Sequence, residues 1–586
     1  MGSVAGRWGD VVRQFMVHRA AYRALRGATL SLACCVVLVV LAGVCVAYWL
    51  VRFPFDGLYG QDSYAYYYQS LEIWRQIRGA PPPAWPFVGE GLYHWPVGYH
   101  LHVMAGFVAG ESPDGGRAIT LLMAALVPAL LCMLVWLLPG SDTGAGSGGR
   151  TLAGLIAGLA LLTTGVYARA SLALMSDVPA LFWALLGLYC WLRAWPPAAA
   201  DEGEDERAAG GQWRSWWGAV AGLVAGVALG MAVLVRYSSV LFLAPAVVYT
   251  GLSLALRKGR RLPLPAVLWA AGGFVVALLP QAAYALTHPG QAGGLTLLED
   301  WDVNHFLAST PARAADGTVS YAHPMAEFYL LDPVRDTAVG FLSLWCLPAV
   351  ACGLYALLRR RQWLTLCFLM SWWLVPASFF SGTAYQAHRF VLVYMPAITV
   401  LVGIGSAHLA GSIWLLFRKG LTAQTAVGCT LALLMLVATT GGLVYDVRAA
   451  TASVRAQATA KEDELRLVAL ARRAAAQPGE LSSARDRAPH ADIVCFGMSA
   501  MLYHYTGWHV LDLYNHDEME TGRFLAGDGA HVVVVPVEQM HTRWRGTPSG
   551  RRWEWLRGNY HLLAVGRVGD YTVFRVIPGP TPRYPP

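Results

Sequence analysis

Two aspartates lie directly beside long apolar runs, where a charged side chain is unusual. Asp62 opens the tyrosine-rich stretch Tyr64–Tyr68, and Asp177 lies in the segment Met175-Ser176-Asp177-Val178-Pro179. We expect both near helix N-termini, where the helix dipole favours a carboxylate. A carboxylate there can accept the proton of an incoming hydroxyl group. The local sequence also allows a plainer role, in which both aspartates cap helices and the tyrosines form an interfacial aromatic belt.

Several cations are predicted to lie at the same level as the two aspartates. They are Arg169, Arg236, His388 and Arg389. Cations hold phosphate groups, so this set matches what group transfer from an anionic lipid carrier requires. A lipid phosphate is already a good leaving group, and the second carboxylic acid of a hydrolase is not needed. Arg236 is equally compatible with a role as a topological anchor.

The composition places these residues in a membrane protein. Of the 586 residues, 56% are hydrophobic, 12% are aromatic and only 14% are charged, whereas soluble domains carry about 25% charged residues. The mean hydropathy is +0.43. The net charge of +8 comes mostly from short clusters such as 257–261 and 359–361, which orient membrane proteins and do not indicate nucleic-acid binding. The ten cysteines include no CxxC pair, so neither a zinc site nor a disulfide framework is indicated.

Apolar runs long enough to cross a bilayer predict an α-helical polytopic membrane protein with about eleven transmembrane helices. Residues 96–110 are short and interrupted by Gly, Pro and two His, so we interpret them as an interfacial helix. The predicted spans are 30–51, 118–139, 151–168, 173–194, 217–235, 239–256, 264–287, 337–358, 362–380, 390–416 and 425–445.

The arginine clusters orient this arrangement. Five arginines within the first 29 residues favour a cytoplasmic N-terminus, and the later clusters then fall on the same side. The segments 52–117 and 288–336 and everything after 446 are therefore predicted to be extracytoplasmic. Residues 1–446 form the predicted transmembrane catalytic domain. Residues 447–586, with strand patterns at 492–496, 531–536 and 571–577, form a predicted extracytoplasmic α/β domain.

The distribution of charge separates the possible classes of membrane protein. The predicted span interiors are nearly free of charge, and the unusual polar residues gather at the outer ends, which favours an active site at the outer membrane boundary. A transporter or flippase of a lipid-linked substrate is the first alternative, and it predicts charge within the spans. A catalytically inert scaffold is the second, and it predicts that Asp62 and Asp177 can both be replaced without loss of function.

The ordered set of motifs resembles the GT-C glycosyltransferases, which take sugars from polyprenyl phosphates, and within them the protein O-mannosyltransferase and aminoarabinose transferase group. The resemblance covers about 340 residues and also fits an outward soluble tail. The motifs are Tyr59–Tyr67, His94–His100, Arg169 with Met175–Pro179, Gly222–Gly230 running into Arg236–Ser239, and His388–Phe390 with Tyr394–Pro396.

The resemblance implies a role for each candidate residue. Asp62 would be the catalytic base for inverting attack on the anomeric carbon, and Asp177 a supporting catalytic carboxylate. Arg169, Arg236, His388 and Arg389 would bind the donor phosphate. Tyr64, Glu90, His94 and His305 would contact the sugar or the acceptor.

The sequence departs from these relatives at three points. Asp62 is followed by Ser, where O-mannosyltransferases have Asp-Glu, so protein mannosylation is not favoured. His94 and Trp95 stand where an aminoarabinose transferase has a lysine, so the resemblance does not supply a phosphate-binding residue at this position. The first outer segment has no Asp-x-Asp, so no cofactor is certain, although a divalent metal ion remains possible.

The sequence thus predicts transfer of a monosaccharide from a polyprenyl-phosphate donor to an extracytoplasmic hydroxyl of a lipid, glycan or protein. We expect the protein in the cell inner membrane, with the lipid bilayer as its environment and no nucleic-acid partner.

Overall fold

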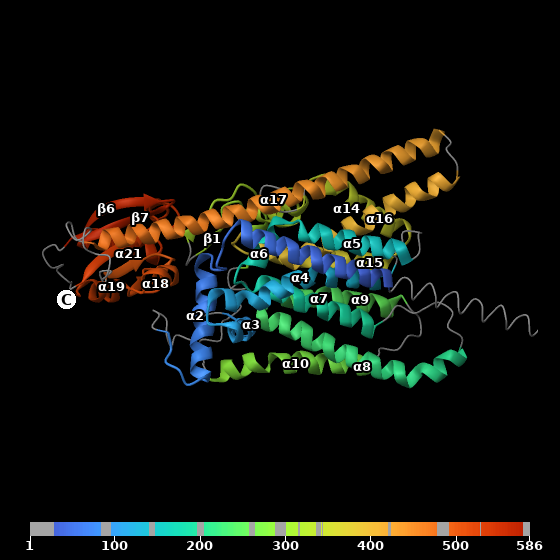
Figure 1. Cartoon of the computed structure of the whole chain (residues 1–586), viewed down its shortest axis with the longest axis horizontal. Helices are drawn as coiled ribbons and strands as arrows, with labels where there is room; N and C mark the ends of the chain where they lie inside the picture. The colour runs from blue at the N-terminus through green and yellow to red at the C-terminus, as the bar shows by residue number, and fades with distance from the viewer. Residues whose placement is uncertain are drawn as a thin grey trace, which may run out of the picture.

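The computed structural model shows a long helical bundle with a small sheet at one end (Figure 1). The residues that it describes are 29–83, 95–139, 147–195, 204–256, 264–287, 301–313, 317–335, 342, 344–419, 423–476, 491–527 and 529–577.

Eight helices in the described part of the chain are long and apolar enough to cross a membrane. The first is Thr29–Arg52, and the last is the start of α17 (Ala423–Ala475). Their most apolar windows have mean hydropathies of 1.5 to 2.9, which suits a lipid environment. The other six are α4 (Pro113–Leu137), α8 (Glu204–Val235), the 3₁₀ turn Tyr237–Phe242 with α9 (Leu243–Ala255), α10 (Leu264–Thr287), α15 (Trp363–Ser381) and α16 (Met395–Lys419).

The remaining predicted spans are shorter or bent. The run 173–194 contains α7 (Asp177–Ala194), and the described part of the run 337–358 contains most of α14 (Leu347–Arg359). Neither helix meets the same criterion of length and apolarity. The described residues therefore contain eight such helices, or nine if a bent pair counts as one span, where the sequence predicted about eleven.

The bent pair corrects the straight span predicted at 151–168. Helix α5 (Ser147–Leu162) and helix α6 (Gly165–Leu172) meet at an angle of 67°. The hydroxyls of Thr163 and Thr164 donate to the carbonyls of Ala160 and Leu161, at 3.0 and 2.9 Å. Such side-chain bonds compete with helix continuation. The bend turns α6 so that Arg169 faces the same cavity as the starts of α2 and α7.

Small residues allow α8 and α10 to approach closely. A Cβ atom added at Gly226 would lie only 1.8 Å from the carbonyl oxygen of Ala270, so only glycine fits there. Close approach of small residues is a common way for membrane helices to pack. The glycines of the motif Gly222–Gly230 thus have a packing role next to the segment that carries Arg236.

The described residues of the segments predicted to be extracytoplasmic lie towards one end of the bundle (Figure 1). Helix α2 (Gly60–Ile77) runs across this end, nearly perpendicular to the bundle helices, and α3 (Val97–Gly106) lies next to it. The predicted interfacial segment 96–110 is α3 with the 3₁₀ turn Phe107–Ala109, and its two histidines are buried. The hairpin β1 (Ala312–Arg313) and β2 (Gly317–Thr318), and the short helices α12 (Met325–Leu330) and α13 (Asp332–Arg335), complete this part.

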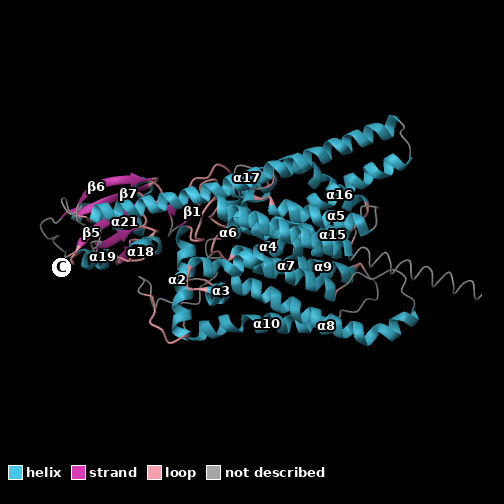
Figure 2. Ribbon diagram, in the orientation of Figure 1, coloured by secondary structure: helices cyan, strands magenta, loops and turns pink. Residues whose placement is uncertain are grey.

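Helix α17 joins the bundle to the C-terminal sheet. It has 53 residues and passes residue 446 without a break, so the predicted domain boundary falls inside this helix. Its first part is apolar and its last part is charged, which explains why the sequence suggested two separate segments. Figure 2 shows the strands gathered around its far end, where the last turns of α17 pack against β5, β6 and β7, apart from the small hairpin β1–β2.

The C-terminal sheet has five strands in the order β4-β3-β5-β7-β6. The three central strands β3 (Ala491–Cys495), β5 (Ala530–Val535) and β7 (Tyr571–Ile577) match the predicted strand patterns. Strands β4 (Val510–Asp512) and β6 (His561–Val568) form the edges and were not predicted. The covering helices are α18 (Ser499–Thr506), α19 (Glu518–Leu525), α20 (Val537–His541) and α21 (Pro548–Asn559). This part is therefore α/β, as predicted.

Candidate active site

A cavity of about 390 Å³ lies at the end of the bundle that carries α2. Four regions of the sequence surround it: the start of α2, helix α6 with the start of α7, the residues that lead into and begin the 3₁₀ turn His388–Val393, and the middle of α17. The lining residues are Tyr59, Gly60, Gln61, Asp62, Val166, Arg169, Ala170, Ala173, Met175, Asp177, Gln386, Ala387, His388, Arg389 and Gln457.

Asp62 pairs with Arg389 at this cavity. The Nη1 atom of Arg389 donates to Oδ2 of Asp62 at 2.7 Å. Asp62 lies in the first turn of α2, as expected, but the N-cap is Tyr59 and no side chain caps this helix. About a third of each side chain remains exposed, so both can meet a ligand. The pairing replaces the simple capping role that the local sequence also allowed.

Asp177 pairs with Arg236 in a more enclosed position. The guanidinium Nη1 of Arg236 donates to Oδ1 of Asp177, and its Nε donates to the Ser238 hydroxyl at 3.0 Å. The side chain of Asp177 is 3% exposed and that of Arg236 is 14% exposed. A buried ion pair costs desolvation free energy, so it is retained only where its partners satisfy each other. Arg236 is therefore not an exposed topological anchor.

A third contact connects the helices that carry the two aspartates. The hydroxyl of Tyr66 on α2 donates to the Ser176 hydroxyl at 3.2 Å, directly before Asp177. Tyr66 lies four residues after Asp62, and residues with this spacing share a helix face. Burial raises the pKa of Tyr66, so its hydroxyl stays protonated and can donate. The sequence drew attention to the tyrosine run but did not single out Tyr66.

The charges favour an anion. Burial lowers the pKa of Arg389, but the carboxylates of Asp62 and Asp177 raise it more, so the net shift is upward and the guanidinium stays charged. Arg169 lines the same cavity from α6. With Arg236, which pairs with Asp177, the site has three arginines against two aspartates. A phosphate group would compensate the excess positive charge.

The structure brings together most of the predicted site residues. Asp62, Asp177, Arg169, His388 and Arg389 line one cavity, and Arg236 reaches it through Asp177. A small void beside it, lined by Asp177, Arg236, Ser239 and Arg389 among others, has room for about one water molecule.

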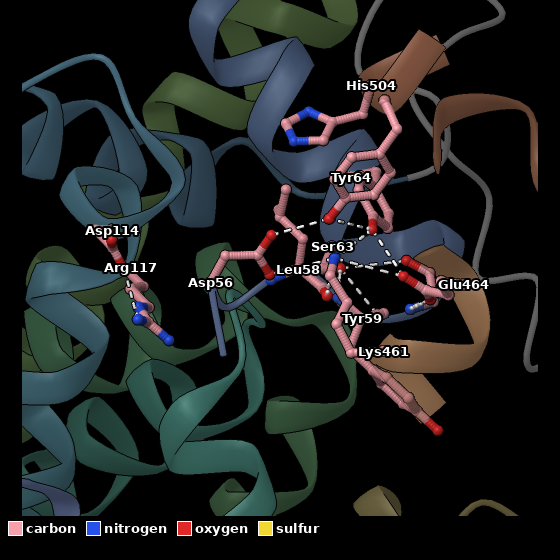
Figure 3. A network of polar contacts seen from close by, with 12 residues as sticks. Asp56, Leu58, Tyr59, Ser63, Tyr64, Asp114, Arg117, Lys461, Glu464 and His504 are labelled. Atoms are coloured by element: carbon pink, nitrogen blue, oxygen red, sulfur yellow. Dashed lines mark hydrogen bonds and ion pairs between the residues drawn. The ribbon is translucent and has the colours of Figure 1, made fainter. Parts of the chain in front are cut away.

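The predicted substrate-contact residues lie elsewhere or outside the described part. Tyr64 is fully buried, does not line the cavity, and donates to Glu464 of α17 at 2.8 Å (Figure 3). It points away from the cavity because a polar partner on α17 satisfies its hydroxyl. The Nδ1 atom of His305 lies 2.9 Å from the Gly382 carbonyl oxygen, and His305 is not part of the cavity lining. Glu90 and His94 lie outside the described residues.

The sequence did not predict three glutamines that line the cavity: Gln61, Gln386 and Gln457. Gln61 directly precedes Asp62 in the sequence, and this position could have indicated that it lines the site. Gln457 had no such indication, because the polar half of α17 has the composition of a solvated helix. Among the described residues, no group of three or more His, Cys, Asp and Glu side chains could hold a metal ion.

The arrangement of the described elements defines the GT-C fold of membrane glycosyltransferases. The structure of ArnT from Cupriavidus metallidurans bound to undecaprenyl phosphate is similar over 92% of this chain and 97% of that chain, with a TM-score of 0.53 and 14% identity. The apo oligosaccharyltransferase from Archaeoglobus fulgidus is similar over 94% of this chain and 75% of that chain, with a TM-score of 0.52 and 13% identity. At these identities the similarity concerns the fold.

A family model gives a second, independent match. Residues 113–289 match the model of the dolichyl-phosphate-mannose-protein mannosyltransferase family. The matched part contains Arg169, Asp177 and Arg236, and it ends before the segment with Arg389. A search of the curated proteins gave no match.

Proposed function

We propose that this protein is a multi-pass membrane glycosyltransferase that moves a monosaccharide from a polyprenyl-phosphate donor to a hydroxyl group outside the cytoplasm. The observation that carries the proposal is the Asp62–Arg389 pair, which places a carboxylate and a guanidinium on one cavity. The GT-C fold, the family model that matches residues 113–289, and an ArnT structure that contains undecaprenyl phosphate support it.

The cations have a defined task in this reaction. The guanidinium groups of Arg389 and Arg169 bind the donor phosphate, with His388 beside them. Arg236, which pairs with Asp177, adds positive charge next to these phosphate-binding groups. When the phosphate takes Arg389 as its partner, the ion pair with Asp62 loosens and leaves the Asp62 carboxylate available as a base.

The chemical step then involves one base and one leaving group. Asp62 accepts the proton of the acceptor hydroxyl while the hydroxyl oxygen attacks the anomeric carbon. The bond between that carbon and the phosphate oxygen breaks, and its electron pair stays on the phosphate. The products are the glycoside with inverted configuration and polyprenyl phosphate. Asp177 keeps Arg236 oriented and supports the positive charge of Arg389.

The position of the site sets the side of the membrane on which transfer occurs. Helix α2, the β1–β2 hairpin and the C-terminal sheet lie at the same end of the bundle. The arginine clusters of the sequence favour a cytoplasmic location for the other end. We therefore assign the cavity to the outer face of the inner membrane, with the N-terminus in the cytoplasm.

The proposal is tested by sugar transfer in protein reconstituted into lipid vesicles. A panel of radiolabelled undecaprenyl-phosphate sugars is supplied with lipid, glycan and peptide acceptors. The expected result is a labelled glycoside with release of one undecaprenyl phosphate for each sugar transferred. Movement of the donor across the bilayer without any transfer would contradict the proposal and indicate a flippase.

A further inference from the structure

Two glutamine amide oxygens at the cavity accept no hydrogen bond from the described residues. Gln61 and Gln457 both line the cavity, and the Oε1 atoms of both are buried without a hydrogen-bond partner among the described residues. Gln457 is only 5% exposed. Buried polar atoms without a partner are rare in native proteins, and each one needs an explanation.

The orientation of the Gln61 amide is determined by the C-terminal α/β part. The Ser499 hydroxyl donates its only proton to Oδ2 of Asp512 at 3.0 Å. Its oxygen can therefore only accept from Gln61, whose Nε2 lies 3.0 Å away. Asp512 is itself held by the backbone N–H groups of Gly497 and Tyr514. The network leaves Oε1 of Gln61 as an acceptor that faces away from Ser499.

Gln457 lies one helical turn before Lys461, which fixes this part of α17 against the segment that precedes α2. Lys461 donates to the Leu58 carbonyl oxygen at 3.1 Å and pairs with Asp56 at 3.2 Å and with Glu464 at 3.4 Å. Figure 3 shows these groups converging between α17 and the segment before Asp62. Residues four apart share a helix face, so the helix face that Lys461 fixes is also the one that presents Gln457 to the cavity.

The chemistry of the missing partner follows from these two acceptors. A phosphate diester offers only acceptors, so the lipid phosphate cannot satisfy an amide oxygen. Sugar hydroxyl groups are neutral donors of suitable size. We propose that Gln61 and Gln457 form a subsite that accepts hydrogen bonds from the hydroxyl groups of the transferred sugar. This inference rests on the proposed function and adds a contribution of the C-terminal part to sugar recognition.

The test compares two ligands that differ only in the sugar. Equilibrium binding of undecaprenyl phosphate, and of the undecaprenyl-phosphate sugar that the wild type transfers, is measured for each purified protein. The ratio of the two affinities isolates the sugar contacts, because the lipid and phosphate are common to both. Gln61→Met and Gln457→Met remove the acceptors at similar volume. Gln457→Glu keeps an acceptor oxygen, and Gln539→Met on α20 is the control.

We expect the affinity ratio to fall about 3–10-fold in each methionine variant, the loss of one neutral hydrogen bond. It should be unchanged in Gln539→Met and largely kept in Gln457→Glu. An unchanged ratio in Gln61→Met and Gln457→Met, with transfer by the wild type intact, would overturn this subsite alone. An equal loss of affinity for both ligands would show that the two glutamines have a purely structural role, and it would also overturn the subsite. Absence of transfer by the wild type would overturn the proposed function, and the subsite with it.

Discussion

The Nη1 atom of Arg389 lies 2.7 Å from Oδ2 of Asp62, although 327 residues separate the two in the sequence. The contact joins the first turn of a helix that lies across the bundle to a 3₁₀ turn between two bundle helices. In the proposed reaction this pair is a resting state that the donor phosphate opens.

Replacing Arg389 should weaken the binding of the lipid phosphate. In Arg389→Gln the guanidinium that would bind the phosphate is lost. Hydrogen bonds to charged groups contribute about 1.5–3 kcal/mol, so the affinity for undecaprenyl phosphate should fall about 10–100-fold. Binding is measured by titration of the reconstituted protein. Arg466→Gln, an exposed ion-pair arginine on α17, should bind as the wild type does. Equal affinities in Arg389→Gln and the wild type would remove Arg389 from the phosphate site.

Replacing Asp177 should affect stability as well as activity. Asp177→Asn leaves Arg236 enclosed without its carboxylate, and breaking a buried pair costs about 3–5 kcal/mol. The midpoint of thermal unfolding in detergent should therefore fall clearly. The double variant Asp177→Asn with Arg236→Gln should recover part of this loss, because no unpaired charge remains. A double variant that loses the sum of the two single effects would show that the pair is not coupled.

Mild acid should loosen the contact between α2 and the C-terminal part. Burial lowers the pKa of His504 on α18 to about 4, although the nearby Asp56 carboxylate raises it, and Nδ1 of His504 lies 2.8 Å from the Tyr68 hydroxyl. The ordinary pKa of 6.5 holds in the unfolded chain. The unfolded state therefore binds the proton first, and stability falls as the pH drops from about 6.5 towards 4.

The size of this effect can be measured by unfolding at different pH values. Between pH 7.5 and pH 5, His504 should account for about 1–2 kcal/mol of lost stability. His504→Phe should unfold with a weaker dependence on pH, whereas His541→Phe on α20 should behave as the wild type does. His100, whose pKa burial lowers to about 3, should preserve part of the acid sensitivity in both variants. An unchanged pH profile in His504→Phe would contradict the assignment.

Much of the site was predictable because its residues stand beside apolar runs. Asp62 and Asp177 both lie in the first turn of a helix, as their flanking Gly, Ser and Pro indicated. Their partners were not predictable one by one, because no local pattern says that Arg389 reaches Asp62 or that Arg236 reaches Asp177. Those pairs depend on the packing of segments that are distant in the sequence.

The differences in the fold also have local physical causes. The length of the apolar run predicted one span at 151–168, but the chain bends at Thr163 and Thr164, whose hydroxyls bond to carbonyls of the preceding turn. Tyr64 was expected at the substrate, yet its side chain points to Glu464, a residue 400 positions later in the sequence. The edge strand β4 has only three residues, too few to form an alternating pattern.

The base assigned to Asp62 is tested most directly by single-turnover transfer with Asp62→Asn, which keeps the shape of the side chain but cannot take the proton. The variant should still bind undecaprenyl phosphate, while transfer falls about 10²–10⁴-fold. Asp463→Asn, from an exposed ion pair on α17, should transfer at the wild-type rate. Transfer by Asp62→Asn at the wild-type rate would contradict the assignment of Asp62 as the base and would favour Asp177 instead.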